Sequence, residues 1–179
     1  MAIYTTMAHV HQSRTLKPLY GFAQATPQAV VLDATFTASD GDIFPGTVLT
    51  LESGGKVTRC NGTKIPAGLS GNWVAPTYGI DEVRRGATGN FEMSMYVLSP
   101  DAKFEIASPA FDTTAAWATA KTELDAGKAV YLKSSTTGLL TLDLTGETGS
   151  QTDNTQTVNS IARLLDYPST STIIIGGLL

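Results

Sequence analysis

The sequence predicts an all-β fold with one short helix, built as a small β-barrel or β-sandwich. Threonine, a β-branched residue that favours strands, accounts for 26 of the 179 residues. Apolar and polar residues alternate in most segments that lie between turn signals. Only one segment, about 113–126, has helical spacing. Barrels and sandwiches both appear in sequence as short strands with regular turns, so both remain open.

The first strands are expected between Val30 and Cys60. "VVLDATFTA" alternates from Leu32, with Ala34 and Phe36 on the same face, and "SDGD" ends it. "FPGTVLTLESGGKVTRC", residues 44–60, predicts a hairpin around Gly54-Gly55. Residues 61–90 are rich in Gly, Pro and Asn and predict a long surface loop with one or two short strands.

Strands are expected again at "NFEMSMYVLSP" and "AKFEIAS", followed by the helix. In that helix Asp112 is the expected N-cap, Trp117, Ala120 and Leu124 share a face, and Gly127 is the expected C-terminal cap.

The last strands are "AVYLKS" and "LLTLDLT" around the turn "STTG", then a polar loop and a strand pair joined at Pro168-Ser169. The closing "IIIGGLL" must be buried in the sheet or covered by another subunit, because an exposed apolar strand invites aggregation.

Two hairpins about 80 residues apart share a pattern. When Leu51 is aligned with Leu132, Gly46 meets Gly127 and two apolar residues precede each leucine by two or three positions. The repetition suggests two similar β-units facing each other across one core. Chance is the alternative, since all hairpins share these features.

Residues 1–28 predict a separate segment, and residues 29–179 the main domain. The first segment holds both histidines and no acidic residue, and its apolar residues follow no clear period. It is either an arm that orders against a partner or an edge strand with its loop. Its partner-binding candidates are Tyr4, His9, His11, Arg14, Lys17, Tyr20 and Phe22.

Composition argues against several functions. The net charge is −4, and scattered cations do not suit nucleic-acid binding. The start of the chain lacks the plan of a signal peptide, and no apolar run reaches the ~20 residues of a membrane helix. We therefore expect synthesis in a cytoplasm, which the lone Cys60 also fits.

No catalytic, metal or cofactor site is predicted. His9 and His11 share a strand face but have no third ligand nearby, so contact with a partner is the preferred interpretation. Trp73 and Tyr78 lie in the Gly/Pro-rich segment, where they either anchor the loop or make a surface contact such as sugar stacking.

Three stretches resemble the capsid decoration, or cement, proteins of tailed bacteriophages. These are "FPGTVLTLESGGKVTRCNG", "LDAGKAVYLKSSTTGLLTLD" and "SIARLLDYPSTSTIIIGGL", and together they cover about a third of the chain. Ala162 stands where the family pattern often has Gly.

The resemblance implies a non-enzymatic virion protein that binds the major capsid protein on the outer capsid surface, between capsomers. It also implies a homo-oligomer, with a trimer favoured, made in the host bacterial cytoplasm. Competing interpretations are a tail or fibre component and a carbohydrate-binding β-module. An enzyme of another type is the least favoured.

Overall fold

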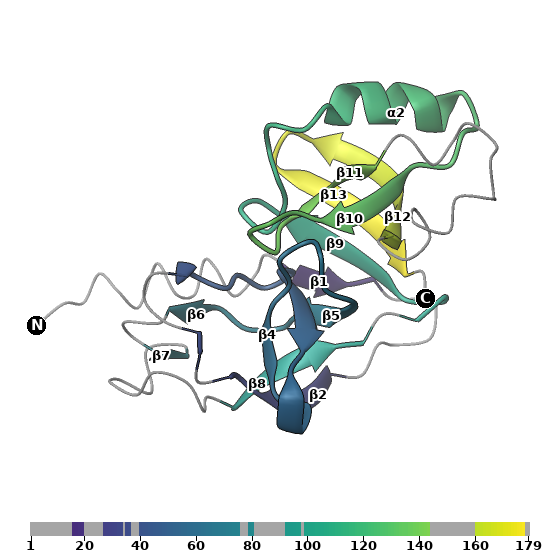
Figure 1. The fold of residues 1–179 in the computed structure, drawn as a ribbon. Helices are drawn as coiled ribbons and strands as arrows, with labels where there is room; N and C mark the ends of the chain where they lie inside the picture. Colours follow the sequence, from purple (N-terminus) through teal and green to yellow (C-terminus); the bar gives the residue numbers. More distant parts are fainter. Residues whose placement is uncertain are drawn as a thin grey trace, which may run out of the picture.

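In the computed structural model, the described residues form two main antiparallel sheets and one α-helix (Figure 1), which confirms the all-β prediction. The structure describes residues 16–19, 27–33, 35–36, 40–75, 79–80, 92–97, 99–143 and 160–177. The two sheets pack against each other as open, sandwich-like layers rather than as a barrel among these residues.

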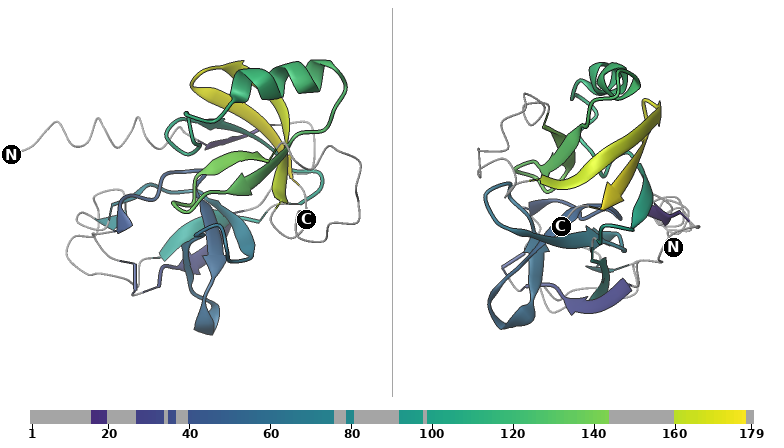
Figure 2. Two further views of the ribbon diagram at one scale, coloured as in Figure 1. Left: turned by 45° about the horizontal axis from the view of Figure 1, so that its top comes forward. Right: turned by 90° about the vertical axis from the view of Figure 1, so that its right-hand side faces the viewer.

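The larger sheet has six strands. Their spatial order is β1 (Leu16–Pro18), β9 (Lys103–Ala107), β13 (Thr172–Gly177), β12 (Ser160–Ser169), β10 (Tyr131–Ser134) and β11 (Leu140–Asp143). The helix α2 (Trp117–Asp125) packs against β12. Figures 1 and 2 show α2 and the five-stranded sheet at opposite ends of the molecule.

The second sheet has five strands, and a small pair of strands accompanies it. The spatial order is β2 (Pro27–Val31), β8 (Glu92–Tyr96), β5 (Pro66–Ser70), β3 (Val48–Leu51) and β4 (Val57–Arg59). The small pair is β6 (Val74–Ala75) with β7 (Gly79–Ile80).

The two sheets repeat one topology. The first unit consists of β2, β3, β4, β5 and β8, and the second unit of β9, β10, β11, β12 and β13. In both units the spatial order is first, fifth, fourth, second and third strand. The structure therefore contains the two similar β-units that the repeated hairpin suggested.

Details of pairing repeat as well. The hairpins close at Leu51↔Val57 and at Ser134↔Leu140, so each encloses a five-residue connection, 52–56 or 135–139. A register shift follows Leu49 in the first unit and Leu132 in the second.

Each unit also joins its first strand to its third by one bridge. Leu32, directly after β2, forms a parallel bridge with Val57, and Phe111, four residues after β9, forms one with Leu140. Each sheet is thus curled, but a single bridge does not close it.

The alignment by sequence was wrong by two residues. The structurally equivalent leucines are Leu49 and Leu132, 83 residues apart, and not Leu51 and Leu132. A shift of two residues preserves the alternation of a strand, so the hydrophobic pattern could not reveal it.

The prediction of one shared core was also incomplete, because there are two. The smaller lies within the first unit and is built from Leu32, Phe36, Ile43, Leu49, Val57, Val74, Met93 and Met95. The larger combines the interior of the second unit with Val48, Cys60 and Leu69 from the first unit.

Two predictions for the first half of the chain are corrected. The strand expected from Leu32 onward is β2 instead, and Asp33 begins a turn, although Leu32 and Phe36 are buried as expected. Within the expected loop 61–90, β5 lies in the middle of its sheet. Its Gly68 allows close strand contact, since a Cβ there would lie 2.5 Å from the Tyr96 oxygen.

The helix begins at Trp117, and Asp112 is not its N-cap. The Asp112 carboxylate accepts bonds from the amide and hydroxyl of Thr114, which makes a turn before the helix. Trp117 and Ala120 face the larger core as predicted, and Gly127 has the left-handed φ of +82°.

The closing strand pair forms, with its turn later than predicted. β12 continues through Pro168 to Ser169, so the turn comes at Thr170 and Ser171. β13 lies between β9 and β12 with Ile173 and Ile175 buried, as expected if the sheet covers this apolar end.

Candidate functional site

The end of the β3–β4 hairpin exposes the most apolar surface among the described residues. Leu51 is 58% exposed and Ile65 is 74% exposed. In the antiparallel pair Thr50↔Pro66, Leu51 follows Thr50 and Ile65 precedes Pro66, so continuing the register places the two side chains opposite each other. We call this pair, with the connection 52–56, the hairpin end.

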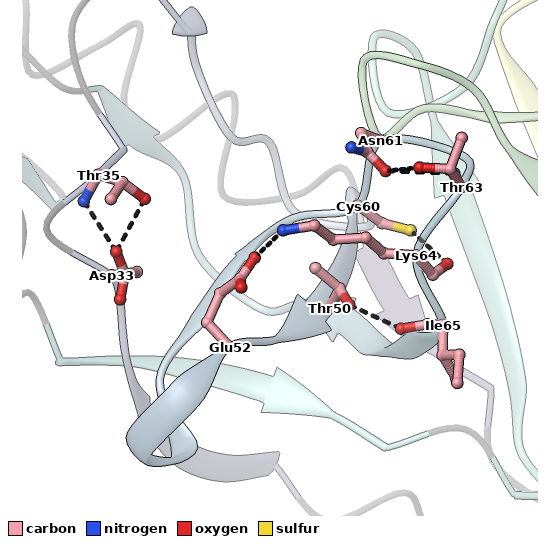
Figure 3. A network of polar contacts seen from close by, with 9 residues as sticks. All are labelled: Asp33, Thr35, Thr50, Glu52, Cys60, Asn61, Thr63, Lys64 and Ile65. Atoms are coloured by element: carbon pink, nitrogen blue, oxygen red, sulfur yellow. Dashed lines mark hydrogen bonds and ion pairs between the residues drawn. The ribbon is translucent and has the colours of Figure 1, made fainter.

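Polar contacts hold the hairpin end in place (Figure 3). The Thr50 hydroxyl donates to the Ile65 carbonyl at 2.7 Å, and the Lys64 ammonium donates to the Glu52 carboxylate. The Cys60 thiol donates to the Lys64 carbonyl at 3.4 Å. The Ile65 side chain points away from these contacts, so the frame fixes its backbone and leaves the side chain in solvent.

Two glycines shape the hairpin end. Gly54 and Gly55 both have φ of +76°, as the sequence predicted for this turn. Gly55 corresponds to Gly138 of the second hairpin, 83 residues later and also at +76°. No atom lies within 4 Å of a Cβ built on Gly55, whereas Gly138 is packed against Arg59 and Thr47.

The tip of the second hairpin packs against the first unit, whereas the tip of the first hairpin has no such neighbour at the equivalent glycine. The Gly138 carbonyl accepts a bond from the Val48 amide at 2.8 Å. Ser134, the counterpart of Leu51, is 8% exposed and donates to the Cys60 carbonyl at 3.4 Å. The fold therefore does not require a large aliphatic residue at this position, and the exposed Leu51 calls for a reason outside the fold.

The structure describes two of the predicted site residues, Lys17 and Trp73. Tyr4, His9, His11, Arg14, Tyr20, Phe22 and Tyr78 lie outside the described residues. Lys17 lies in the edge strand β1, and its ammonium is 3.7 Å from the Glu105 carboxylate.

Trp73 lies where a residue that anchors its loop is expected, which is the first of the two alternatives given for it above. It is 7% exposed, and its indole N–H donates to the Asp42 carboxylate at 2.9 Å. A buried indole offers no open ring face for sugar stacking. The hairpin end was missed because Leu51 and Ile65 read as ordinary strand residues, and only the equivalent Ser134 would have marked Leu51 as unusual.

Metal and membrane features are not seen in the described ranges. No three His, Cys, Asp or Glu side chains there gather in a way that could hold a metal ion. The helices in these ranges also lack the length and apolar character needed to cross a membrane.

The family of phage cement proteins matches residues 2–177. The chain belongs to this family. Comparison with curated proteins and with solved structures gives no match. The family is one of structural proteins that stabilise a phage capsid, so this cement protein associates with the capsid of a virion and its role is structural.

Proposed function

We propose that this cement protein binds the outer surface of the capsid where neighbouring capsomers meet, with the major capsid protein as its partner. The family match over residues 2–177 carries the proposal. Internal pressure from packaged DNA loads the joints between capsomers most heavily. A protein that binds the assembled lattice better than separate subunits stabilises the lattice by mass action.

The hairpin end is the first proposed contact. Leu51 and Ile65 form an exposed apolar pair on a frame held by hydrogen bonds and an ion pair. A preorganised apolar anchor loses little conformational freedom on binding. It suits an apolar depression on the shell protein.

The N-terminal segment is the second proposed contact, through Tyr4, His9, His11, Arg14, Lys17, Tyr20 and Phe22. The part of this segment that precedes β1 is acid-free and carries Arg14, so it can add a strand to an exposed sheet edge of the shell protein. In a trimer, three such segments would reach three shell subunits, and weak contacts would act together.

Removal of residues 1–15 tests this proposal, because the deletion stops before β1. Full-length protein added to capsids lacking cement protein should co-sediment with them and raise the temperature at which they release DNA. The deletion variant should keep its unfolding midpoint but lose most capsid binding. Absence of binding between these capsids and the full-length protein would refute the proposed function. Unchanged binding by the deletion variant would refute only the role of residues 1–15, with Tyr4, His9, His11 and Arg14.

A further inference from the structure

The outward face of the second unit carries a row of residues from four neighbouring strands. Register places Lys103, Gly176, Arg163 and Tyr131 directly opposite one another on β9, β13, β12 and β10. Directly opposed residues share one face of a sheet. Their neighbours Phe104, Ile175 and Leu132 are fully buried and point into the core, so the row faces outward.

An apolar side chain lies in the middle of this face. A Cβ on Gly176 would lie 3.2 Å from Leu165 Cδ1, so Leu165 rests over the glycine, and it remains 41% exposed. Arg163 is exposed, and its Cζ lies 5.9 Å from the centre of the Tyr131 ring. We call the set Lys103, Tyr131, Lys133, Arg163 and Leu165 the Tyr131–Arg163 face.

The same face of the first unit is a protein-packing surface. By register its row is Val48, Leu69, Tyr96 and Pro27. Val48 and Leu69 are fully buried in the larger core, and the Tyr96 ring lies 5.6 Å from Phe104 of the second unit. In the first unit this face is therefore the one that packs against a neighbouring β-unit.

Charge indicates what the face of the second unit would bind. It holds three cations, whereas the whole chain carries a net charge of −4. The acid at the end of the row, Asp143, is 7% exposed. In the next row, Glu105 lies 3.7 Å from Lys17 and Asp166 lies 2.8 Å from Lys121, so each of these acids already has a cation beside it. Arg and Tyr are enriched at protein interfaces, and a cationic patch is complementary to an acidic partner.

We propose that the Tyr131–Arg163 face docks on an acidic surface of the capsid shell protein. This inference rests on the proposed function and adds a third contact, beside the hairpin end and the N-terminal segment. The hairpin end and the Tyr131–Arg163 face belong to different units, so each unit then holds the shell. Three cations beside apolar groups suit a protein better than nucleic acid, which needs a longer cationic track.

Charge reversal in the full-length protein tests the inference. R163E and K133E should each weaken binding to cement-free capsids by about tenfold, because each places an acid against an acidic surface. K128E makes the same change in charge just beyond the end of α2 and should leave binding within about twofold. Wild-type binding should weaken from about 50 to 300 mM salt, and R163E binding should depend less on salt.

Each outcome decides one claim. Equal binding by R163E, K133E and wild type would show that the face is only a solvated surface and would overturn the inference, with the capsid role intact. Binding of the wild type to double-stranded DNA, lost in R163E, would also overturn it. A wild-type protein that binds no capsid would refute the proposed function itself. Unfolding midpoints equal to that of the wild type would show that the variants are folded.

Discussion

Two aspartates play the same part in the two units. Asp33 and Asp112 each donate a backbone amide to the carbonyl of the bridged residue on the third strand, at 2.7 and 2.8 Å. Each carboxylate also accepts bonds from the amide and hydroxyl of the threonine two residues later, Thr35 or Thr114. The carboxylate thus fixes a turn at the point where each unit begins its curl.

These bonds make stability depend on pH in acid. Hydrogen bonds from Thr114 hold the pKa of Asp112 below its ordinary value of 3.8, and those from Thr35 do the same for the pKa of Asp33. The Lys121 ammonium, 2.8 Å away, lowers the pKa of Asp166.

A carboxylate with a lowered pKa stabilises the folded state above the ordinary pKa of 3.8, and that contribution is lost as the pH falls through the folded value. The free energy of unfolding should therefore decline below pH 3.8. Urea titrations at several pH values would measure the decline. D33N/D112N keeps an acceptor for each turn but cannot titrate, so its curve should be flatter. A curve as steep as that of the wild type would contradict this assignment.

Single residues also show the limits of sequence interpretation. Asp112 stands where an N-cap would be expected, yet its partner is two residues away and the helix starts five residues later. Both uses of Asp satisfy free backbone amides, and they share the same local sequence preferences. Only the bond from its own amide to Leu140, a residue distant in sequence, decides between them.

At the scale of elements, Gly55 and Gly138 form a matched pair. Both have φ of +76°, so an alanine costs about 1–2 kcal/mol of backbone strain at either position. At Gly138 the new Cβ would also lie 2.3 Å from Arg59 Cγ. G138A should therefore lose about 1–3 kcal/mol more than G55A, the usual cost of overpacking. Urea unfolding of both variants measures the difference, and equal losses would show that the contact between the hairpins relaxes freely.

The hairpin end gives a second prediction at this scale. L51S/I65N installs the residues of the second unit, Ser134 and the Asn159 that precedes Ser160. The Leu51 and Ile65 side chains that are replaced are exposed, so the free energy of unfolding should change by about 0.5 kcal/mol or less. Capsid affinity should fall by about tenfold, as expected for loss of an apolar anchor. Undiminished affinity in a co-sedimentation assay would exclude the hairpin end as a contact.

Elements were predictable where local sequence alone decides them. The Gly54-Gly55 hairpin and the alternating strands β8 and β9 were expected close to their observed bounds. β5 was hidden because Pro66, Gly68 and Gly71 look like loop residues, although they permit close packing in a central strand. The Tyr131–Arg163 face could not be predicted either, because the pairing register of four strands cannot be inferred from the sequence of any single strand.

At the scale of the whole molecule, one β-unit is used twice with different surfaces. The outward row of the first unit, with Val48 and Leu69, is buried between the units, and the outward row of the second faces solvent. For the hairpins the difference is reversed: the second hairpin packs against the first unit, and the first hairpin is exposed at its tip. The hairpin end and the Tyr131–Arg163 face, two of the proposed capsid contacts, therefore belong to different units, which suits a protein that bridges neighbouring capsomers.

The order of the two units along the chain has a consequence for biosynthesis. Every strand of the first unit, from Pro27 to Tyr96, leaves the ribosome before Lys103 begins the second. Until the second half emerges and folds, Val48, Cys60 and Leu69 have nothing to cover them. The nascent first half therefore exposes apolar residues that are prone to association. If the second half of a neighbouring nascent chain covers them at that moment, the product is a domain-swapped dimer.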